Sequence, residues 1–186
     1  MILPIFTYGQ PVLREKSEPV ANDYPDLQQL VKDMFETMYK ADGIGLAAPQ
    51  IGLPIQLFVI DADALAKDHP ECKGFKKVMI NPEIVDTKDE TISFEEGCLS
   101  FPGIHEKVSR FTGITVKYSD ENLNLHEETL EGFTARVVQH ECEHLAGGVF
   151  IDNISPIRKQ LNKGKLNNII KGIAKCSYRT KTVKKQ

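Results

Sequence analysis

The stretch Gln139-His140-Glu141-Cys142-Glu143-His144-Leu145 contains the pattern H-E-x-x-H. In an α-helix, residues i and i+4 lie one turn apart on one face, so both imidazoles can reach a single metal ion. Glu141 falls on a neighbouring face, beside that ion, where its carboxylate can accept a proton from water. We therefore interpret the stretch as a catalytic metal-binding helix. The alternative is an ordinary surface helix that carries two histidines.

Length and composition favour one globular domain. A chain of 186 residues, 41% hydrophobic and 26% charged, can bury a core without disulfides or a structural metal. No apolar run approaches the roughly 18 residues that cross a bilayer, so we expect no membrane association. The first residues lack the basic leader and cleavage site of a signal peptide. The four cysteines have no framework spacing, so we expect a cytoplasmic protein in which Cys72, Cys98, Cys142 and Cys176 are free thiols or metal ligands and form no disulfides.

Charge is distributed unevenly along the chain. All 26 acidic residues and 13 of the 23 Lys and Arg lie in residues 1–152, whereas residues 153–186 hold ten basic residues and no acid. This split indicates a basic appendage on an acidic body, suited to an anionic partner such as RNA. A solvated basic helix with one packed face is the alternative.

The order of predicted elements indicates an α+β fold. Apolar spacing predicts an amphipathic helix over 26–41, capped by Asn22 or Asp23. The motif helix spans 133–146 and stops at Gly147-Gly148. Because long strands follow one another without alternating helices, we expect antiparallel or mixed sheets packed around the central metal-binding helix. The predicted strands are 55–60, 78–82, 91–96, 114–118 and 124–129, with a strand-like patch near 11–13.

The C-terminal part is predicted to hold one more helix. Ser155-Pro156 is a cap followed by proline at the first helical position, and this helix runs to about Ala174. Residues 1–176 are therefore expected to form a single catalytic domain that includes the basic helix 155–174. We expect residues 177–186 to be a disordered basic tail.

A catalytic metal site of this kind needs a third protein ligand and an open position. Phe150 stands where an extended zinc-peptidase motif would place a third histidine, and Glu143 is the last glutamate of the chain. Downstream, only Asp152 and Cys176 remain as candidates. Upstream, Cys98 follows Gly97 at a strand end, and its thiolate is a good donor. We favour Cys98, with a buried structural cysteine as the alternative interpretation.

Three segments now carry a resemblance: Gly43-Ile44-Gly45-Leu46-Ala47-Ala48-Pro49-Gln50, Glu96-Gly97-Cys98-Leu99-Ser100 and Gln139-His140-Glu141-x-x-His144. In this order and spacing they resemble the signature segments of peptide deformylase, the family that removes the N-formyl group from nascent polypeptides. The resemblance extends from about Pro11 to the terminal helix. One departure is Glu143, where the family usually has Asp.

The resemblance implies a ligand set and a mechanism. Cys98, His140 and His144 would bind one divalent metal, Fe²⁺ in the cell, with Zn²⁺, Ni²⁺ or Co²⁺ able to replace it. Glu141 would take the proton of the attacking water, and the Gln50 amide and the Leu99 backbone N–H would stabilise the oxyanion. The nascent formyl-Met polypeptide would be the substrate. The basic C-terminal helix would dock on the ribosome near the exit tunnel.

The peptide is expected to lie extended against Ile44-Gly45 and the turn at Phe101–Gly103, next to Gly97. A methionine side chain needs an apolar pocket, and Phe133 and Val137 precede His140 on the metal face of its helix. With Ile44 and Phe94 they are the pocket candidates, and plain core packing is the alternative. Arg110 and Arg136 either border the substrate path or lie on the solvated surface.

Two other functions compete with deformylation. One is a different metallohydrolase, a peptidase or another amidase. The other is a structural Cys/His metal site on a ribosome-binding module, although Glu141 would then be idle and such sites usually take four protein ligands.

Overall fold

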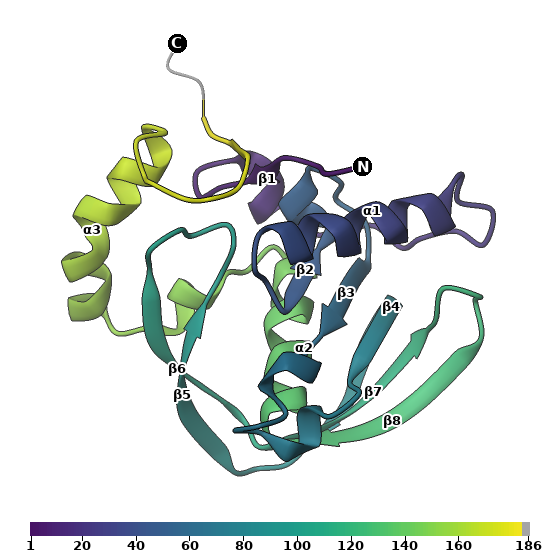
Figure 1. Ribbon diagram of the computed structural model, residues 1–186. Coiled ribbons are helices and arrows are strands. Elements are labelled where there is room, and N and C mark those ends of the chain that lie inside the picture. The colour runs from purple at the N-terminus through teal and green to yellow at the C-terminus, as the bar shows by residue number, and fades with distance from the viewer. Residues whose placement is uncertain (184–186) are drawn as a thin grey trace.

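The computed structural model describes residues 1–183 (Figure 1). Within them, the chain forms three α-helices: α1 (Leu27–Lys40), α2 (Gly132–Leu145) and α3 (Pro156–Ile170). The strands are β1 (Ile5–Phe6), β2 (Gly45–Ala47), β3 (Leu57–Asp61), β4 (Lys76–Thr87), β5 (Thr91–Gly97), β6 (His105–Phe111), β7 (Gly113–Ser119), β8 (Leu125–Glu131) and β9 (Thr180–Lys181). The predicted α+β class with a central H-E-x-x-H helix is confirmed.

A five-stranded antiparallel sheet, in the order β2-β3-β4-β7-β8, separates α1 from α2. Successive side chains of β3 pack alternately into the cores on the two faces of this sheet. Phe58 and Ile60 belong to the core shared with α2, whereas Leu57 and Val59 belong to the core shared with α1. Because successive side chains of a strand point to opposite faces, a continuously apolar strand fits between two helices.

The motif helix α2 is buried along most of its length, which fixes the direction of its polar side chains. Ala135, Val138 and Leu145 pack in the core beneath the five-stranded sheet. The helix ends at Leu145 with Ala146 as its C-cap residue, and Gly147 follows with a φ of 78°. A Cβ at Gly147 would overlap the backbone of Arg14, so both conformation and space require glycine there.

A separate two-stranded sheet, β5 with β6, lies beside α2 and carries Cys98 just beyond its first strand. The sequence predicted β5 but missed β6, although His105–Phe111 has alternating burial. The strand predicted at 78–82 continues to Thr87 as β4, with irregular pairing around Asn81 and Val85. The patch near 11–13 is wrong as a strand, because Pro11–Arg14 forms a 3₁₀ helix. The predicted caps of α1 are also wrong: Asp26 is the N-cap residue and makes no side-chain cap bond.

The C-terminal helix α3 begins as predicted, with Ser155 Oγ accepting from the N–H of Arg158 at 3.3 Å. The chain after α3 differs from the predicted disordered tail. Strand β9 pairs in parallel with β1, so residues 179–181 are held against the N-terminal strand. Residues 184–186 of the predicted tail lie outside the described residues. Among the residues described, no helix is long and apolar enough to span a membrane.

Candidate metal centre and substrate cavity

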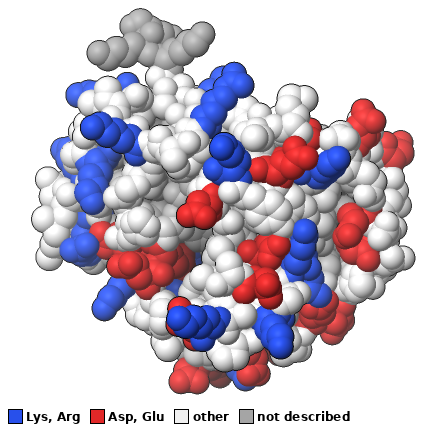
Figure 2. All heavy atoms as spheres, in the orientation of Figure 1, with Lys and Arg blue, Asp and Glu red and all other residues white. Residues whose placement is uncertain are grey.

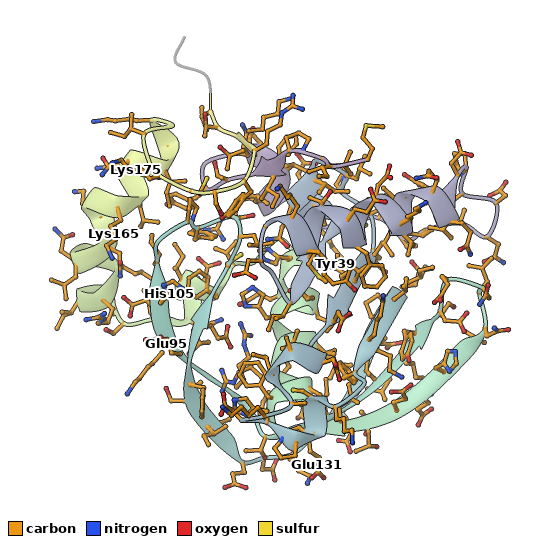
Figure 3. The ribbon with its side chains drawn as sticks, in the orientation of Figure 1. Tyr39, Glu95, His105, Glu131, Lys165 and Lys175 are labelled. Atoms are coloured by element: carbon orange, nitrogen blue, oxygen red, sulfur yellow. The ribbon has the colours of Figure 1, made fainter. Side chains whose placement is uncertain are left out.

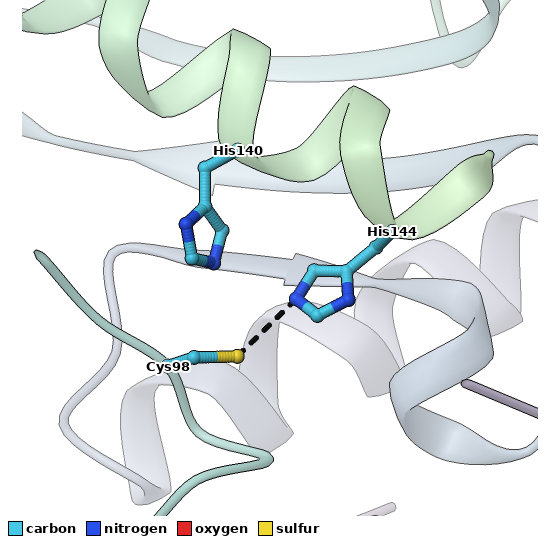
Figure 4. Close-up of side chains that lie close together, drawn as sticks. All are labelled: Cys98, His140 and His144. Atoms are coloured by element: carbon cyan, nitrogen blue, oxygen red, sulfur yellow. Dashed lines mark hydrogen bonds between the residues drawn. The ribbon is translucent and has the colours of Figure 1, made fainter. Parts of the chain in front are cut away.

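The structure brings Cys98, His140 and His144 together (Figure 4). One donor atom from each lies within 4.8 Å of the other two, and Cys98 Sγ is 3.2 Å from His144 Nε2. Helix α2 supplies the two imidazoles on successive turns, and the end of β5 supplies the thiol. The residue set that the sequence suggested is therefore a compact cluster in space. Cys142 lies away from it in the core with Val138 and Leu145, and burial raises the pKa of its thiol to about 12.

Glu96 orients the first histidine. Its Oε2 lies 2.9 Å from His140 Nδ1, which leaves Nε2 of that ring free to bind a metal. Burial opposes ionisation of Glu96, but hydrogen bonds from His140 and Arg110 outweigh it and lower its pKa to about 2. The sequence carries a signal for this partner. In an extended chain, Glu96 and Cys98 lie two residues apart and so face the same side.

Two arginines neutralise Glu96, and neither lies on the solvated surface. Arg110 donates to both carboxylate oxygens at 2.6 and 2.9 Å, and Arg136 donates to Oε1 at 2.6 Å. Both are almost fully buried, and Arg136 also donates to the carbonyls of Ile92 and Val108. The surface interpretation of these arginines is therefore wrong. Arg136 does border the cavity described below.

Glu143, the departure from the family pattern, joins the same network. Its carboxylate accepts from Arg110 at 3.0 Å and from Asn153 Nδ2 at 2.6 Å. The longer side chain thus still reaches the arginine that pairs with Glu96. Glu143 consequently contacts His140 only indirectly, through Arg110 and Glu96.

Glu141 is buried beside the cluster and has an unused acceptor. Its side chain lines the cavity, and Oε2 has no hydrogen-bond partner among the described residues. Burial raises the pKa of this carboxyl to about 7. A Cβ at Gly45 would overlap Glu141 Oε1, so the small residue at 45 makes room for the carboxylate. This contact explains one glycine of the Gly43–Gln50 segment.

Gln50 and Leu99 flank the cluster from two loops. The Gln50 amide donates to Ser100 Oγ at 3.1 Å and lies 3.4 Å from Cys98 Sγ, while its Oε1 accepts from the N–H of Ala47 at 2.9 Å. Leu99 lines the cavity, and its backbone N–H has no hydrogen-bond acceptor among residues 1–183. A Cβ at Gly43 would overlap the Leu99 side chain, so this glycine also makes room for its neighbour.

A cavity of about 450 Å³ opens beside the metal-binding cluster. Most of the predicted substrate residues line it: Ile44, Gly45, Gly97, Phe101, Phe133 and Val137. Phe94 does not line it. Phe94 is 43% exposed, and its ring makes a T-shaped contact with the ring of Phe133, with the ring centroids 6.2 Å apart. Phe94 therefore packs against Phe133 from outside the cavity. His69, which the sequence did not single out, stacks on Phe133 at 4.4 Å.

The donor cluster suits a divalent cation. Burial lowers the pKa of His140, but hydrogen bonds with Cys98 and Glu96 outweigh it and raise that pKa to about 10. Burial, together with the charge of His140, moves the pKa of His144 well below its ordinary value. Two imidazoles and a thiolate are donors that Zn²⁺, Fe²⁺, Co²⁺ and Ni²⁺ accept.

An H-E-x-x-H helix with a third donor, a buried carboxylate and an adjoining cavity defines a metal-dependent hydrolase. Comparison with known proteins gives the family. Residues 2–160 match the family model described as polypeptide deformylase. A curated peptide deformylase of Flavobacterium psychrophilum is 47% identical over the full length of both chains, and that of Cytophaga hutchinsonii is 42% identical over 97% of each.

Solved structures of peptide deformylases have the same fold as this chain. A peptide deformylase from Legionella pneumophila aligns with a TM-score of 0.80 at 40% identity, covering 90% of this chain and 95% of that one. One from Thermotoga maritima aligns with a TM-score of 0.76 at 42% identity, covering 84% and 99%. The chain belongs to the peptide deformylase family, divalent-metal enzymes that remove the formyl group from the N-terminal methionine of nascent polypeptides.

Proposed function

We propose that Cys98, His140 and His144 hold a single divalent ion, Fe²⁺ in the cell, with Zn²⁺, Ni²⁺ or Co²⁺ able to replace it. The observation that carries this assignment is the convergence of the three donor atoms within 4.8 Å of one another. When bound, the ion supplies Lewis acidity that makes hydroxide available near neutral pH. The choice of Fe²⁺ follows the family resemblance, since the donor set itself suits all four ions.

Glu141 is the proposed general base and acid. Its unpartnered Oε2 is buried at the edge of the cavity, where a water can bond to it. The carboxylate takes a proton as the water oxygen attacks the formyl carbon. It returns the proton to the nitrogen as the C–N bond breaks, which leaves formate and a free amine.

The charge that develops on the formyl oxygen needs preorganised donors. We assign the Gln50 side-chain amide and the Leu99 backbone N–H to this role. Gln50 is supported by the position of its side-chain amide 3.4 Å from Cys98 Sγ. Leu99 is supported by a backbone N–H that has no hydrogen-bond acceptor among residues 1–183. Gln50 is held by Ala47 and Ser100, so its amide needs little rearrangement to act.

The apolar part of the cavity is the proposed methionine pocket. Phe133, Val137 and Ile44 supply its surface, with the ring of Phe94 behind Phe133. Gly45, Gly97 and Phe101 border the path of an extended peptide, whose backbone pairing reads no sequence. A formyl carbon carries only hydrogen on its far side, so a tight site there rejects larger acyl groups.

An assay with two substrates tests this assignment. Protein purified without oxygen is incubated with formyl-Met-Ala and with acetyl-Met-Ala, and formate and free amine are measured. Release from the formyl peptide alone is the expected result. Cleavage of the Met-Ala bond would indicate a peptidase instead, and bound metal without turnover would indicate a structural site. Loss of metal is expected for Cys98→Ala, so normal metal content in that variant would contradict the ligand set.

The rest of the proposal concerns cellular context. We assign the enzyme to the cytoplasm, where nascent chains are made and where its four free cysteines stay reduced. The chain acts as one catalytic domain that includes α3. This helix docks on ribosomal RNA. Figure 2 shows Lys and Arg along the side of the molecule formed by α3, and its apolar side chains Ile157 and Leu161 are exposed.

Ribosome docking can be tested without removing α3. Charge reversal at Lys159 and Lys163, both exposed, should weaken ribosome binding and its salt dependence while hydrolysis of formyl-Met-Ala is unchanged. Reversal at Lys67 and Lys73, which lie outside α3, is the control. Equal ribosome binding by both double variants would exclude α3 as the docking surface.

A further inference from the structure

The chain after α3 returns to the active site. We name residues 175–183 the C-terminal strap. In Figure 1 the strap is the yellow segment that leaves α3 and passes between β1 and the turn that joins β5 to β6. Its residues Lys175, Cys176, Ser177 and Tyr178 line the same cavity as Glu141 and His140. The family model stops at residue 160, before the strap, whereas the relative from Flavobacterium psychrophilum aligns with the full length of this chain.

The strap is anchored on the N-terminal strand. The carbonyl of Arg179 accepts from the N–H of Ile5 at 2.9 Å, and the carbonyl of Lys181 accepts from the N–H of Thr7 at 3.1 Å. The same N-terminal segment supports the catalytic loops. The ring of Phe6 packs over Gly52, next to the 3₁₀ helix η2 (Ala48–Ile51) that carries Gln50. These bonds give the strap a fixed place relative to the site.

Tyr178 connects the strap to the loop that follows Cys98. Its hydroxyl donates to the carbonyl of Leu99 at 2.7 Å. From the other side, the N–H of Tyr8 donates to the carbonyl of Ser100 at 2.9 Å, and Gln50 donates to Ser100 Oγ. Fixing both carbonyls fixes the peptide planes after Leu99 and Ser100. The direction of the Leu99 N–H then has little freedom, because only φ and ψ of one residue separate it from a fixed plane.

The region around the strap is also bordered by α3. Lys165 of α3 donates to the carbonyl of Gly103 at 3.2 Å, in the turn between β5 and β6. Figure 3 shows Lys165 and Lys175 on the side of the molecule formed by α3, with Glu95 and His105 on the two strands beside it. Glu95, His105 and Lys175 all line the cavity. The strap therefore shares this cavity with β5 and β6.

We propose that the C-terminal strap is a wall of the substrate cavity and that Tyr178 is a positioning residue, which aims the Leu99 N–H at the formyl oxygen. The proposal rests on the oxyanion role assigned to Leu99 above. Tyr178 touches no reacting atom. Its hydroxyl acts through the Leu99 carbonyl, and its backbone and its neighbours in the strap shape the space for residues that follow methionine.

Removal of one hydroxyl tests the positioning role. Tyr178→Phe should lower kcat for formyl-Met-Ala by about three- to tenfold, the loss typical of one neutral hydrogen bond, while KM changes less than about twofold. Tyr118→Phe is the matched control, because Tyr118 also donates its hydroxyl, to Glu128 at 2.7 Å, but lies outside the cavity. Its kcat should equal that of the unmodified protein.

A second readout does not depend on activity. Hydrogen exchange at the Leu99 and Ser100 amides should be faster in Tyr178→Phe than in Tyr118→Phe, with equal metal content in both. Unchanged exchange together with unchanged kcat in Tyr178→Phe would overturn the positioning role. Gln50→Ala separates this outcome from a failure of the proposed oxyanion site. If Gln50→Ala also retains full kcat, the oxyanion assignment itself is wrong.

The role of the strap as a cavity wall is tested by placing a larger side chain on the strap, where it would occupy part of the cavity. Ser177 is exposed and lines the cavity, so Ser177→Phe should fold and should raise KM at least threefold for formyl-Met-Ala-Ser. Ser109→Phe, at an exposed position of β6 that does not line the cavity, is the control. Equal KM values for the two variants would show that the strap does not border the bound peptide.

Discussion

Charged residues surround α2 and also line α3, but they are buried around α2 and exposed along α3. Around α2, Glu96, Arg110 and Arg136 are buried and paired with one another. Along α3, only Asn162 and Ile169 are buried, and the Lys and Arg residues are exposed, although Arg158 and Lys165 also hydrogen-bond to Glu106 and Gly103. A helix that performs chemistry needs its side chains fixed by a surrounding network. A helix that offers a surface to another molecule does not.

The largest expected effect lies on α2. Glu141→Ala should lower turnover of formyl-Met-Ala by about 10²–10⁴-fold, because the buried carboxylate that accepts the proton is lost. Metal content, measured by atomic absorption, should stay the same, since Cys98, His140 and His144 are intact. Glu127→Ala on the exposed face of β8 is the control. Substantial activity in Glu141→Ala would assign the proton transfer to another group.

The next effect concerns the network that holds α2. Glu96→Ala leaves Arg110 and Arg136 buried without their carboxylate and should cost about 3–5 kcal/mol of unfolding free energy. Metal affinity should fall as well, because His140 loses the partner that orients its ring. Chemical denaturation measures the first effect and metal titration the second. Glu95→Ala, one residue away and exposed, should change stability little, and equal losses in the two variants would refute the network's role.

A smaller effect is expected where α3 attaches to β6. Arg158 donates to Glu106 at 2.8 Å and holds the pKa of Glu106 below its ordinary value. A lowered pKa stabilises the folded state above the unfolded pKa of about 4.3, and this contribution is lost as pH falls through the folded pKa. Because Arg158 is half exposed, Glu106→Gln should lower Tm at pH 7 by only about 3 °C or less.

The pH dependence of that difference is the measurement. Melting curves of the unmodified protein and of Glu106→Gln should converge as the pH falls below about 4. If the Tm difference between the unmodified protein and Glu106→Gln stays constant between pH 7 and pH 3, the charge of Glu106 does not stabilise the attachment of α3 to β6.

The smallest effect is expected on the free face of α3. Leu161 is 67% exposed, so Leu161→Ser should change the unfolding free energy by less than about 0.5 kcal/mol. Ile169→Ala, on the packed side of the same helix and 1% exposed, should cost about 2–5 kcal/mol. If both variants lose similar stability, Leu161 is covered by protein in solution, and the free face assigned to ribosome docking is not free.

Much of the site was predictable because its signals are local. The spacing of His140 and His144 follows from helix periodicity, and α2 forms where the sequence placed it. Cys98 was chosen as the third candidate ligand by excluding later donors, and Gln50 and Leu99 came from the resemblance. Strand β6 was missed because its register is set by pairing with β5.

The roles of Glu96, Arg110 and Arg136 were not predictable in the same way. Arg110 lies 14 residues and Arg136 lies 40 residues from Glu96, so only the fold brings their charges together. Most charged residues lie on the protein surface, because burying an unpaired charge costs several kcal/mol of desolvation free energy. Burial is tolerated only where the fold places an oppositely charged partner beside the residue. Phe94 shows the reverse: it is apolar and near the site, yet the structure puts it outside the cavity lining.

The sequence by itself determined the α+β class, the metal-binding helix and the kind of chemistry, since all three depend on short-range periodicity and residue type. Only the tertiary structure decided which charges are buried together and where the chain after α3 lies. Both are contacts between segments distant in the sequence. The bond from Tyr178 to Leu99, 79 residues apart, is of this kind. Such contacts form because packing brings their segments together, and no local pattern of residues encodes them.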